Sequence, residues 1–134
     1  MDDELIVDVL IIGAGISGLI CATELQNSGL QVVLLDKGRR AGGRLSTRDM
    51  QEARVDYGAQ FFTVRDPRFQ NYVDQWINSG VIREWFRHAD WDTNATGYPR
   101  YCGVTGMNSI AKHLARTLDV HHSEEVVKLS RRGD

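Results

Sequence analysis

One short stretch near the start of this chain constrains its fold more than any other feature. The stretch LIVDVLIIGAGISGLICATELQ places Gly13, Gly15 and Gly18 between an apolar run and a helix-like run. Leu5 to Ile12 predicts a strand buried on both faces, and Ile16 to Asn27 predicts a helix with an inward apolar stripe. A strand that enters a helix through such glycines is typical of folds that hold phosphate groups at a helix start.

The next apolar run, Leu30 to Leu35, ends in an acid, Asp36. Strand, helix and strand within about 30 residues form one βαβ unit. In a dinucleotide-binding unit the glycines allow a tight turn and a close approach to the pyrophosphate, and the acid accepts hydrogen bonds from a ribose. A glycine-rich turn in another kind of α/β protein is the alternative, and the acid argues against it. We therefore predict a Rossmann-like α/β fold with a parallel sheet, whose faces other elements must cover.

Asp36 and the loop that follows it help to identify the dinucleotide that the chain would bind. The charge of Asp36 disfavours a 2′-phosphate, and hence NADP. The loop Lys37 to Thr47 contains Gly42-Gly43-Arg44, two flexible positions and a cation that can reach a diphosphate. A nicotinamide dehydrogenase has no evident need for this second glycine pair, so the loop favours FAD. A solvated basic loop, and an NAD-dependent dehydrogenase, stay open as alternatives.

Further elements are expected in the rest of the chain. Asp66-Pro67 predicts an N-cap followed by a proline in the first turn of a helix that runs to about Asn78. The stretch from Ala89 to Pro99, rich in Asp, Thr, Asn and Gly, predicts a loop. The other expected elements are strands over Ala53–Tyr57, Val81–Phe86, Val120–His122 and Val126–Leu129, a helix over Met107–Leu118, and a hairpin turn over Arg131–Asp134.

Composition and charge exclude several classes of function. A net charge of −2 with both signs dispersed provides no field for nucleic acid or an anionic membrane. The N-terminal apolar stretch is interrupted by Asp8 and glycines, so neither a membrane span nor a signal peptide is expected. Cys21 and Cys102 are far apart, and the four histidines lack ligand spacing, so we expect no disulfide, no metal site and a cytoplasmic location. The chain shows no nucleophile elbow and no pair of carboxylates with acid/base spacing.

Three longer motifs carry a family resemblance. GAGISGL, DKGRRAGGRLSTR and DYGAQFFTVRDPRF resemble the flavin-containing amine oxidase superfamily, and within it the renalase-like branch. The third string is the most discriminating. GVIREW and YCGVTGMNSI also resemble bacterial renalase-like proteins, so that the likeness runs over nearly the whole chain.

The resemblance implies FAD as the cofactor and names residues that would bind it. The phosphate loop and the second glycine loop would surround the diphosphate, the acid would hold the adenosine ribose, and a later motif would lie beside the flavin ring. A short segment near the C-terminus would meet the adenine with its backbone. The implied cofactor-binding residues are Gly13, Ala14, Gly15, Ile16, Ser17, Gly18, Asp36, Lys37, Gly43, Arg44, Ala59, Gln60, Phe61 and Val127.

The resemblance also implies an activity. Family members are FAD-dependent oxidoreductases that oxidise a small reduced substrate by hydride transfer to the flavin, with O2 as the acceptor. The implied substrate is a misreduced isomer of dihydronicotinamide dinucleotide, and an amine is the second choice. A direct hydride transfer demands no protein acid or base, in agreement with the residues present.

The length of the chain limits this expectation. Family members are more than twice as long, so the 134 residues are expected to be the N-terminal FAD-binding portion, from a fragment or a truncated product. The region of about residues 60–105 is expected to contribute flavin-side elements and the beginning of a substrate domain. A dinucleotide-binding remnant without turnover is the alternative from another class. The sequence leaves the oligomeric state open.

Overall fold

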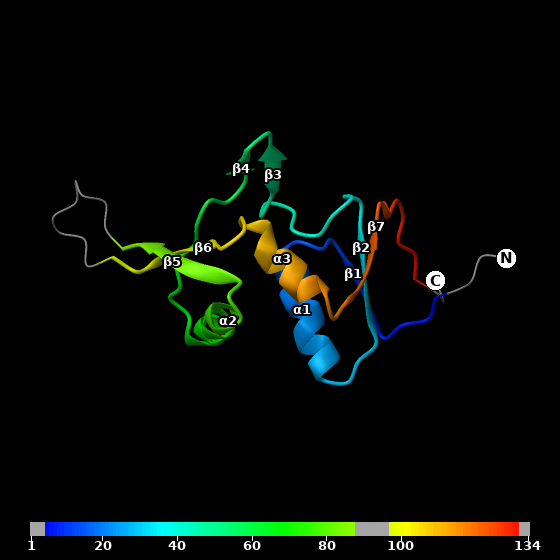
Figure 1. Cartoon of the computed structure of the whole chain (residues 1–134). Coiled ribbons are helices and arrows are strands. Elements are labelled where there is room, and N and C mark those ends of the chain that lie inside the picture. The colour runs from blue at the N-terminus through cyan, green and yellow to red at the C-terminus, as the bar shows by residue number, and fades with distance from the viewer. Residues whose placement is uncertain (1–4, 88–96, 132–134) are drawn as a thin grey trace. The chain divides into compact units, whose positions relative to one another are not determined.

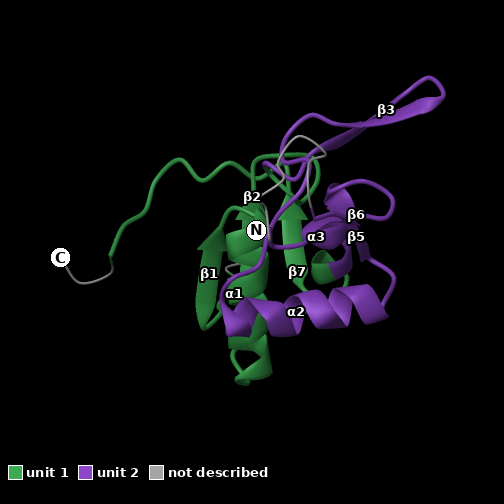
Figure 2. Cartoon of the chain, turned by 90° about the vertical axis from the view of Figure 1, so that its left-hand side faces the viewer, with its two compact units in different colours: residues 1–43, 114–134 green, residues 44–113 purple. Residues whose placement is uncertain are grey.

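A computed structural model of the chain describes residues 5–87 and 97–131 (Figure 1). The chain divides into two compact units (Figure 2). Unit 1 comprises residues 1–43 and 114–134, and unit 2 comprises residues 44–113. None of the helices in the described ranges is long and apolar enough to cross a membrane.

Unit 1 contains a three-stranded parallel sheet with the strand order β1-β2-β7. In this sheet Val9 pairs with Val32, and Asp36 at the end of β2 pairs with His122. The predicted βαβ unit is confirmed, and with it the Rossmann-like α/β class. The elements of unit 1 are β1 (Val9–Ile12), α1 (Ile16–Asn27), β2 (Val32–Asp36) and β7 (Asp119–His122).

Helix α1 begins and ends where the glycines predict. Gly15 is its N-cap and supplies no side chain to the first turn. Leu19 and Ala22 form its buried side. At the other end Ser28 caps the helix and Gly29 adopts a φ of +89°, a conformation that suits glycine.

The prediction that β1 is buried on both faces is wrong. The strand is shorter than the apolar run, and its exposure alternates, with Leu10 at 42% and Ile12 at 54%. β1 is an edge strand, and α1 packs on one face of β1 and β2. In the described part of unit 1 no second helix covers the other face, so alternate side chains of β1 are exposed to solvent.

Unit 2 contains two antiparallel strand pairs, β3 with β4 and β5 with β6. Its core is aromatic: Phe62 lies near Phe69, Trp76 and Tyr101, with ring centroids 5.7 to 6.4 Å apart. Helix α3 begins in unit 2, and its last two residues belong to unit 1. The elements are β3 (Thr47–Met50), β4 (Ala53–Asp56), α2 (Pro67–Asn78), β5 (Ile82–Phe86), β6 (Arg100–Gly103) and α3 (Asn108–Ala115).

The predicted start of α2 is confirmed. Asp66 is the N-cap, its Oδ1 accepts a hydrogen bond from the Arg68 amide at 2.8 Å, and Pro67 occupies the first turn. The helix is amphipathic and buries Val73 and Trp76. Its cap and its apolar stripe are both local in sequence, which is why the pattern alone located it.

Three elements differ between the prediction and the structure. Two strands, β3 and β6, are present but were not predicted. The strand predicted over Val126–Leu129 is absent, since residues 124–131 form neither helix nor strand. In the described ranges no strand pairs with that segment, and the side chain of Val127 is 89% exposed. Most of the predicted loop over Ala89–Pro99, and the turn beyond Arg131, lie outside the described residues.

Candidate functional site

The phosphate loop, residues 13–18, runs from the end of β1 into the first turn of α1 and has the backbone geometry that its glycines require. Gly13 adopts a φ of +101°, and its amide donates to the Leu35 carbonyl at 2.8 Å. A methyl group at Gly18 would lie 2.1 Å from the Gly13 carbonyl oxygen, whereas one at Gly15 would meet nothing within 4 Å. The close contact at Gly18 packs the helix on the turn, and the open space at Gly15 is free for a ligand.

Ile16 and Ser17 lie in the first turn of α1, and Ser17 is exposed. Because no side chain caps this helix, its first amides are available to an anion, and the positive end of the helix dipole favours one.

Asp36 lies at the end of β2, with its carboxylate fixed by two backbone amides. Its Oδ2 accepts from the amide of Ala14 at 2.6 Å, and its Oδ1 accepts from the amide of Gly38 at 2.7 Å. An ionised carboxylate has about four acceptor positions, so two of them are left for ribose hydroxyls. The sequence located the acid but gave no sign that the phosphate loop itself orients it.

The second glycine loop lies against the phosphate loop within unit 1. The Gly42 amide donates to the Ala14 carbonyl at 2.8 Å, and Gly42 forms an isolated bridge with Gly15. Gly43 has a φ of +51°, and a methyl group there would lie 3.6 Å from the Gly15 Cα. The two loops therefore form one backbone surface. Lys37, at the start of this segment, is exposed.

Four predicted residues, Arg44 and the run from Ala59 to Phe61, belong to unit 2. The Ala59 amide donates to the Arg44 carbonyl at 2.8 Å, which extends the β3–β4 pairing toward its open end. A methyl group at Gly58 would lie 2.0 Å from that same carbonyl oxygen, so the neighbouring glycine allows this approach. Arg44 and Ala59 are thus brought together by backbone contacts.

Gln60 lines an open groove of unit 2 with a volume of about 580 Å³. Phe61 is 42% exposed, and its ring lies near those of Trp85 and Phe86, at 6.3 and 5.9 Å. The sequence reasoning missed two residues of the groove, Arg83 and Trp85. Their spacing of two along a predicted strand was a signal for a shared face, although the strand pairing shifts register between Glu84 and Phe86.

Val127 lies in the segment after β7, which forms neither helix nor strand, and is 89% exposed. The segment does start beside the acid, because the Glu124 amide donates to the Asp36 carbonyl and the Ser123 amide to the Gly38 carbonyl, each at 3.0 Å. The role of Val127 stays a prediction.

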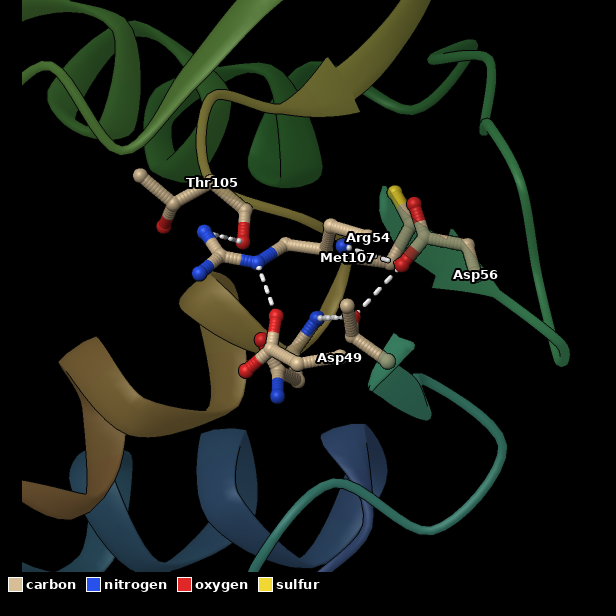
Figure 3. A network of polar contacts seen from close by, with 7 residues as sticks. Asp49, Arg54, Asp56, Thr105 and Met107 are labelled. Atoms are coloured by element: carbon tan, nitrogen blue, oxygen red, sulfur yellow. Dashed lines mark hydrogen bonds and ion pairs between the residues drawn. The ribbon is translucent and has the colours of Figure 1, made fainter. Parts of the chain in front are cut away.

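A polar network ties the start of α3 to the β3–β4 hairpin (Figure 3). Asp56 Oδ1 accepts from the Thr47 hydroxyl at 2.5 Å and from the Met107 amide at 2.9 Å. Thr47 in turn accepts from the Asn108 amide at 3.0 Å. Two side chains of the hairpin thereby cap the N-terminus of α3, a role that their sequence positions did not predict.

Arg54 lies next to this network, as Figure 3 shows. Its guanidinium donates to Asp49 Oδ1 at 2.7 Å and to the Thr105 carbonyl at 3.1 Å. The positive charge of Arg54 is therefore already matched by a carboxylate.

Comparisons with known proteins agree with this geometry. Residues 11–76 match the family described as the NAD(P)-binding Rossmann-like domain. The chain is 44% identical over 55 residues to the flavin-containing amine oxidase B of Sus scrofa, a match that covers 40% of the chain and 11% of the relative. It is 29% identical over 119 residues to the FAD-binding monooxygenase acrE of Aspergillus aculeatus, with 89% of the chain and 16% of the relative covered.

A solved structure of putrescine oxidase with bound putrescine is also similar. Its TM-score is 0.51 and its identity 33%, and the match covers 62% of the chain and 18% of the oxidase. The chain spans between 6% and 21% of the length of seven curated relatives that it matches.

These matches show a Rossmann-like region that is similar to the NAD(P)-binding Rossmann-like family and whose homologues include flavin-dependent amine oxidases and FAD monooxygenases. The prediction of FAD as the cofactor is confirmed at the level of these homologues. The renalase-like branch stays a prediction.

Proposed function

We propose that this Rossmann-like chain, homologous to flavin-dependent amine oxidases, is the FAD-binding portion of an FAD-dependent oxidoreductase of renalase-like type. The observation that carries the proposal is the joined backbone surface of unit 1, where the loops at Gly15 and Gly42 meet. Open space at Gly15, an uncapped helix start and an oriented acid fit the diphosphate and ribose of a dinucleotide.

The residues of unit 1 are assigned to the adenosine diphosphate half of FAD. The amides at the start of α1 would hold the phosphates, and Asp36 would accept from the ribose hydroxyls. Its charge disfavours a dinucleotide with a 2′-phosphate. Val127 is assigned to the adenine, since its segment starts beside this acid.

The residues of unit 2 are assigned to the diphosphate and the flavin side. Arg44 would contact the diphosphate, and Ala59, Gln60 and Phe61 would lie beside the ring. When bound, FAD would accept a hydride from a reduced substrate and pass the electrons to O2. The protein's task is to orient the ring and the substrate, so no protein acid or base is needed.

The substrate is the finer part of the proposal. A reduced dinucleotide isomer is the first candidate because of the renalase-like motifs, which extend to Tyr101–Ile110. An amine is the second candidate, since the relatives include amine oxidases and a putrescine oxidase. From another class, a dinucleotide-binding remnant without turnover predicts a bound cofactor and no oxidation of either substrate.

Arg44 provides a direct test with a matched control. Arg44→Ala should weaken FAD binding about tenfold to a hundredfold, because a charge-assisted contact to the diphosphate is lost. The fold should be kept, since the Arg44 contact with Ala59 uses the backbone carbonyl. Calorimetric titration with FAD measures the affinity.

Arg39→Ala removes the same charge from the same basic loop and should leave the affinity nearly unchanged. Equal losses of FAD affinity in the two variants would show that Arg44 acts only through the general positive charge of the loop. Binding of NADH without any binding of FAD would instead favour a nicotinamide dehydrogenase.

A further inference from the structure

The open groove of unit 2 has chemistry that the cofactor assignment does not use. Its floor is one face of the β5–β6 sheet, where Arg83 pairs with Cys102 and Trp85 follows two residues later. Its walls come from the β4 strand and from the turn before α3. The lining residues are Arg54, Val55, Asp56, Gln60, Arg83, Trp85, Cys102, Gly103, Val104, Thr105 and Gly106.

The charged side chains around the groove differ in how they are engaged by the protein. Arg54 is paired with Asp49, and Asp56 accepts two hydrogen bonds at the N-terminus of α3, where the helix dipole favours a negative charge. Arg83 is different: among the residues that the structure describes it has no ion-pair partner. In the described lining the cation left for a ligand is therefore the guanidinium of Arg83, while the carboxylate of Asp56 is engaged at the start of α3.

Trp85 supplies a flat apolar surface beside this charge. Trp85 is 50% exposed, and its ring lies 5.0 Å from that of Phe86, in a T-shaped arrangement, and 6.3 Å from that of Phe61. Although the β5–β6 register shifts between Glu84 and Phe86, both Arg83 and Trp85 line the groove. A single small molecule can therefore contact both Arg83 and Trp85.

We propose that this groove binds the substrate and that the substrate is a ring-bearing anion, with its phosphate or carboxylate on Arg83 and its ring on Trp85. The inference rests on the proposed function in one respect, which is the assignment of Gln60, at the edge of the groove, to the flavin. A protonated amine would face the charge of Arg83, and Asp56, the carboxylate of the groove, already accepts two hydrogen bonds at the start of α3, so an amine is disfavoured. Within the proposed function, the groove therefore favours an anionic aromatic substrate over an amine.

Two probes with the same ring and opposite charge test the inference. Phenyl phosphate and benzylamine are titrated against the purified chain, with and without saturating FAD, and binding is followed by ligand-observed NMR. Phenyl phosphate should bind at least about tenfold more tightly than benzylamine, because only the anion gains a charge-assisted contact with Arg83. Its affinity should fall as salt is added.

Variants assign the binding to the groove. Arg83→Gln should weaken phenyl phosphate about tenfold or more, Arg83→Lys should recover part of the loss, and Trp85→Leu should remove the advantage of phenyl phosphate over inorganic phosphate. Arg65→Gln is the control, because it removes an exposed arginine of the same unit that lies over the Tyr98 ring, outside the groove. Thermal unfolding verifies that each variant is folded.

The outcomes separate this inference from the proposed function. Benzylamine binding as tightly as phenyl phosphate, or phenyl phosphate binding unchanged by Arg83→Gln, overturns the inference even if FAD binds. Arg83-dependent binding of phenyl phosphate to a chain that does not bind FAD supports the anion site and contradicts the proposed function. Arg83-dependent binding in the FAD-saturated chain supports both.

Discussion

Gly15 and Gly18 differ in what surrounds them, although both belong to one motif. A methyl group at Gly18 would overlap the Gly13 carbonyl, a backbone atom that can move only with the turn. The same group at Gly15 would point into open space, at a φ of −76° that any residue adopts. Gly18 therefore serves the packing of the protein itself, and Gly15 leaves open space, which the proposed function assigns to the ligand.

This difference makes a matched pair of variants informative. Gly18→Ala should destabilise the fold by about 1 to 3 kcal/mol, as overpacking does, and should abolish FAD binding. Gly15→Ala should leave the thermal unfolding midpoint nearly unchanged and still abolish FAD binding. Thermal unfolding and FAD titration measure the two effects. Gly15→Ala with wild-type affinity for FAD would contradict the placement of the diphosphate.

Asp66 is the residue whose ionisation is most altered in the described structure. Hydrogen bonds from the Arg68 side chain, and then from its amide, lower the pKa of the Asp66 carboxyl from 3.8 to about 2. Because the folded pKa lies below the unfolded one, the charged cap adds stability above about pH 4, and this contribution disappears as the pH falls toward 2.

The pH dependence gives a prediction for this cap. An NMR titration of the carboxyl carbon of Asp66 should show a midpoint near 2 in the native chain. Arg68→Leu should move the midpoint toward 3.8, because it removes the largest cause of the shift. A midpoint near 3.8 in the unmodified chain would show that the pair does not form in solution.

At the scale of elements, the hairpin and α3 depend on each other. The N-terminal amides of α3 are satisfied by Asp56 and Thr47, which belong to different strands of the hairpin. Gly106, at a φ of +99°, allows the close approach, since a methyl group there would lie 2.5 Å from the Thr47 side chain. The hairpin that carries Arg44 and Ala59 at its open end is thereby anchored.

Removal of this anchor should cost stability. Asp56→Ala leaves the Thr47 hydroxyl and the Met107 amide without their acceptor, a loss of about 1 to 3 kcal/mol for partly buried groups. Chemical denaturation measures the free energy of unfolding. Glu84→Ala, which breaks an exposed ion pair with Arg87, is the control and should change it much less. Equal effects would show that the network contributes little.

The elements that could be predicted from the sequence are those with local signals. Helix α1 lies between two glycine turns, and α2 starts at an Asp-Pro cap, so both were located to within a residue or two. The place of the phosphate loop and of Asp36 in the fold was predictable for the same reason, because the motif fixes the turn and the second strand, while their role in binding stays a prediction.

The elements that could not be predicted depend on pairing between distant residues. β3 has the polar sequence TRDM, and its turn uses Gln51 at a φ of +51° in place of the glycine or asparagine expected there. The segment Val126–Leu129 has strand-like residues but no neighbouring strand in the described ranges. The groove at Arg83 and Trp85 likewise appears only when β5 pairs with β6.

At the scale of the whole molecule, the chain has two compact units and spans a small part of its relatives' length. The backbone surface of unit 1 and the side chains of unit 2 are each assigned to a different part of the same cofactor. The central claim is therefore that this chain, as it stands, binds FAD and does not use a nicotinamide dinucleotide in its place.

The absorbance of the purified chain tests that claim most directly. After incubation with FAD and removal of the free cofactor, the chain should retain flavin absorption with bands near about 375 and 450 nm. NAD added in excess should not displace it. A colourless chain after the same treatment, or a chain from which NAD displaces the flavin, would contradict the account.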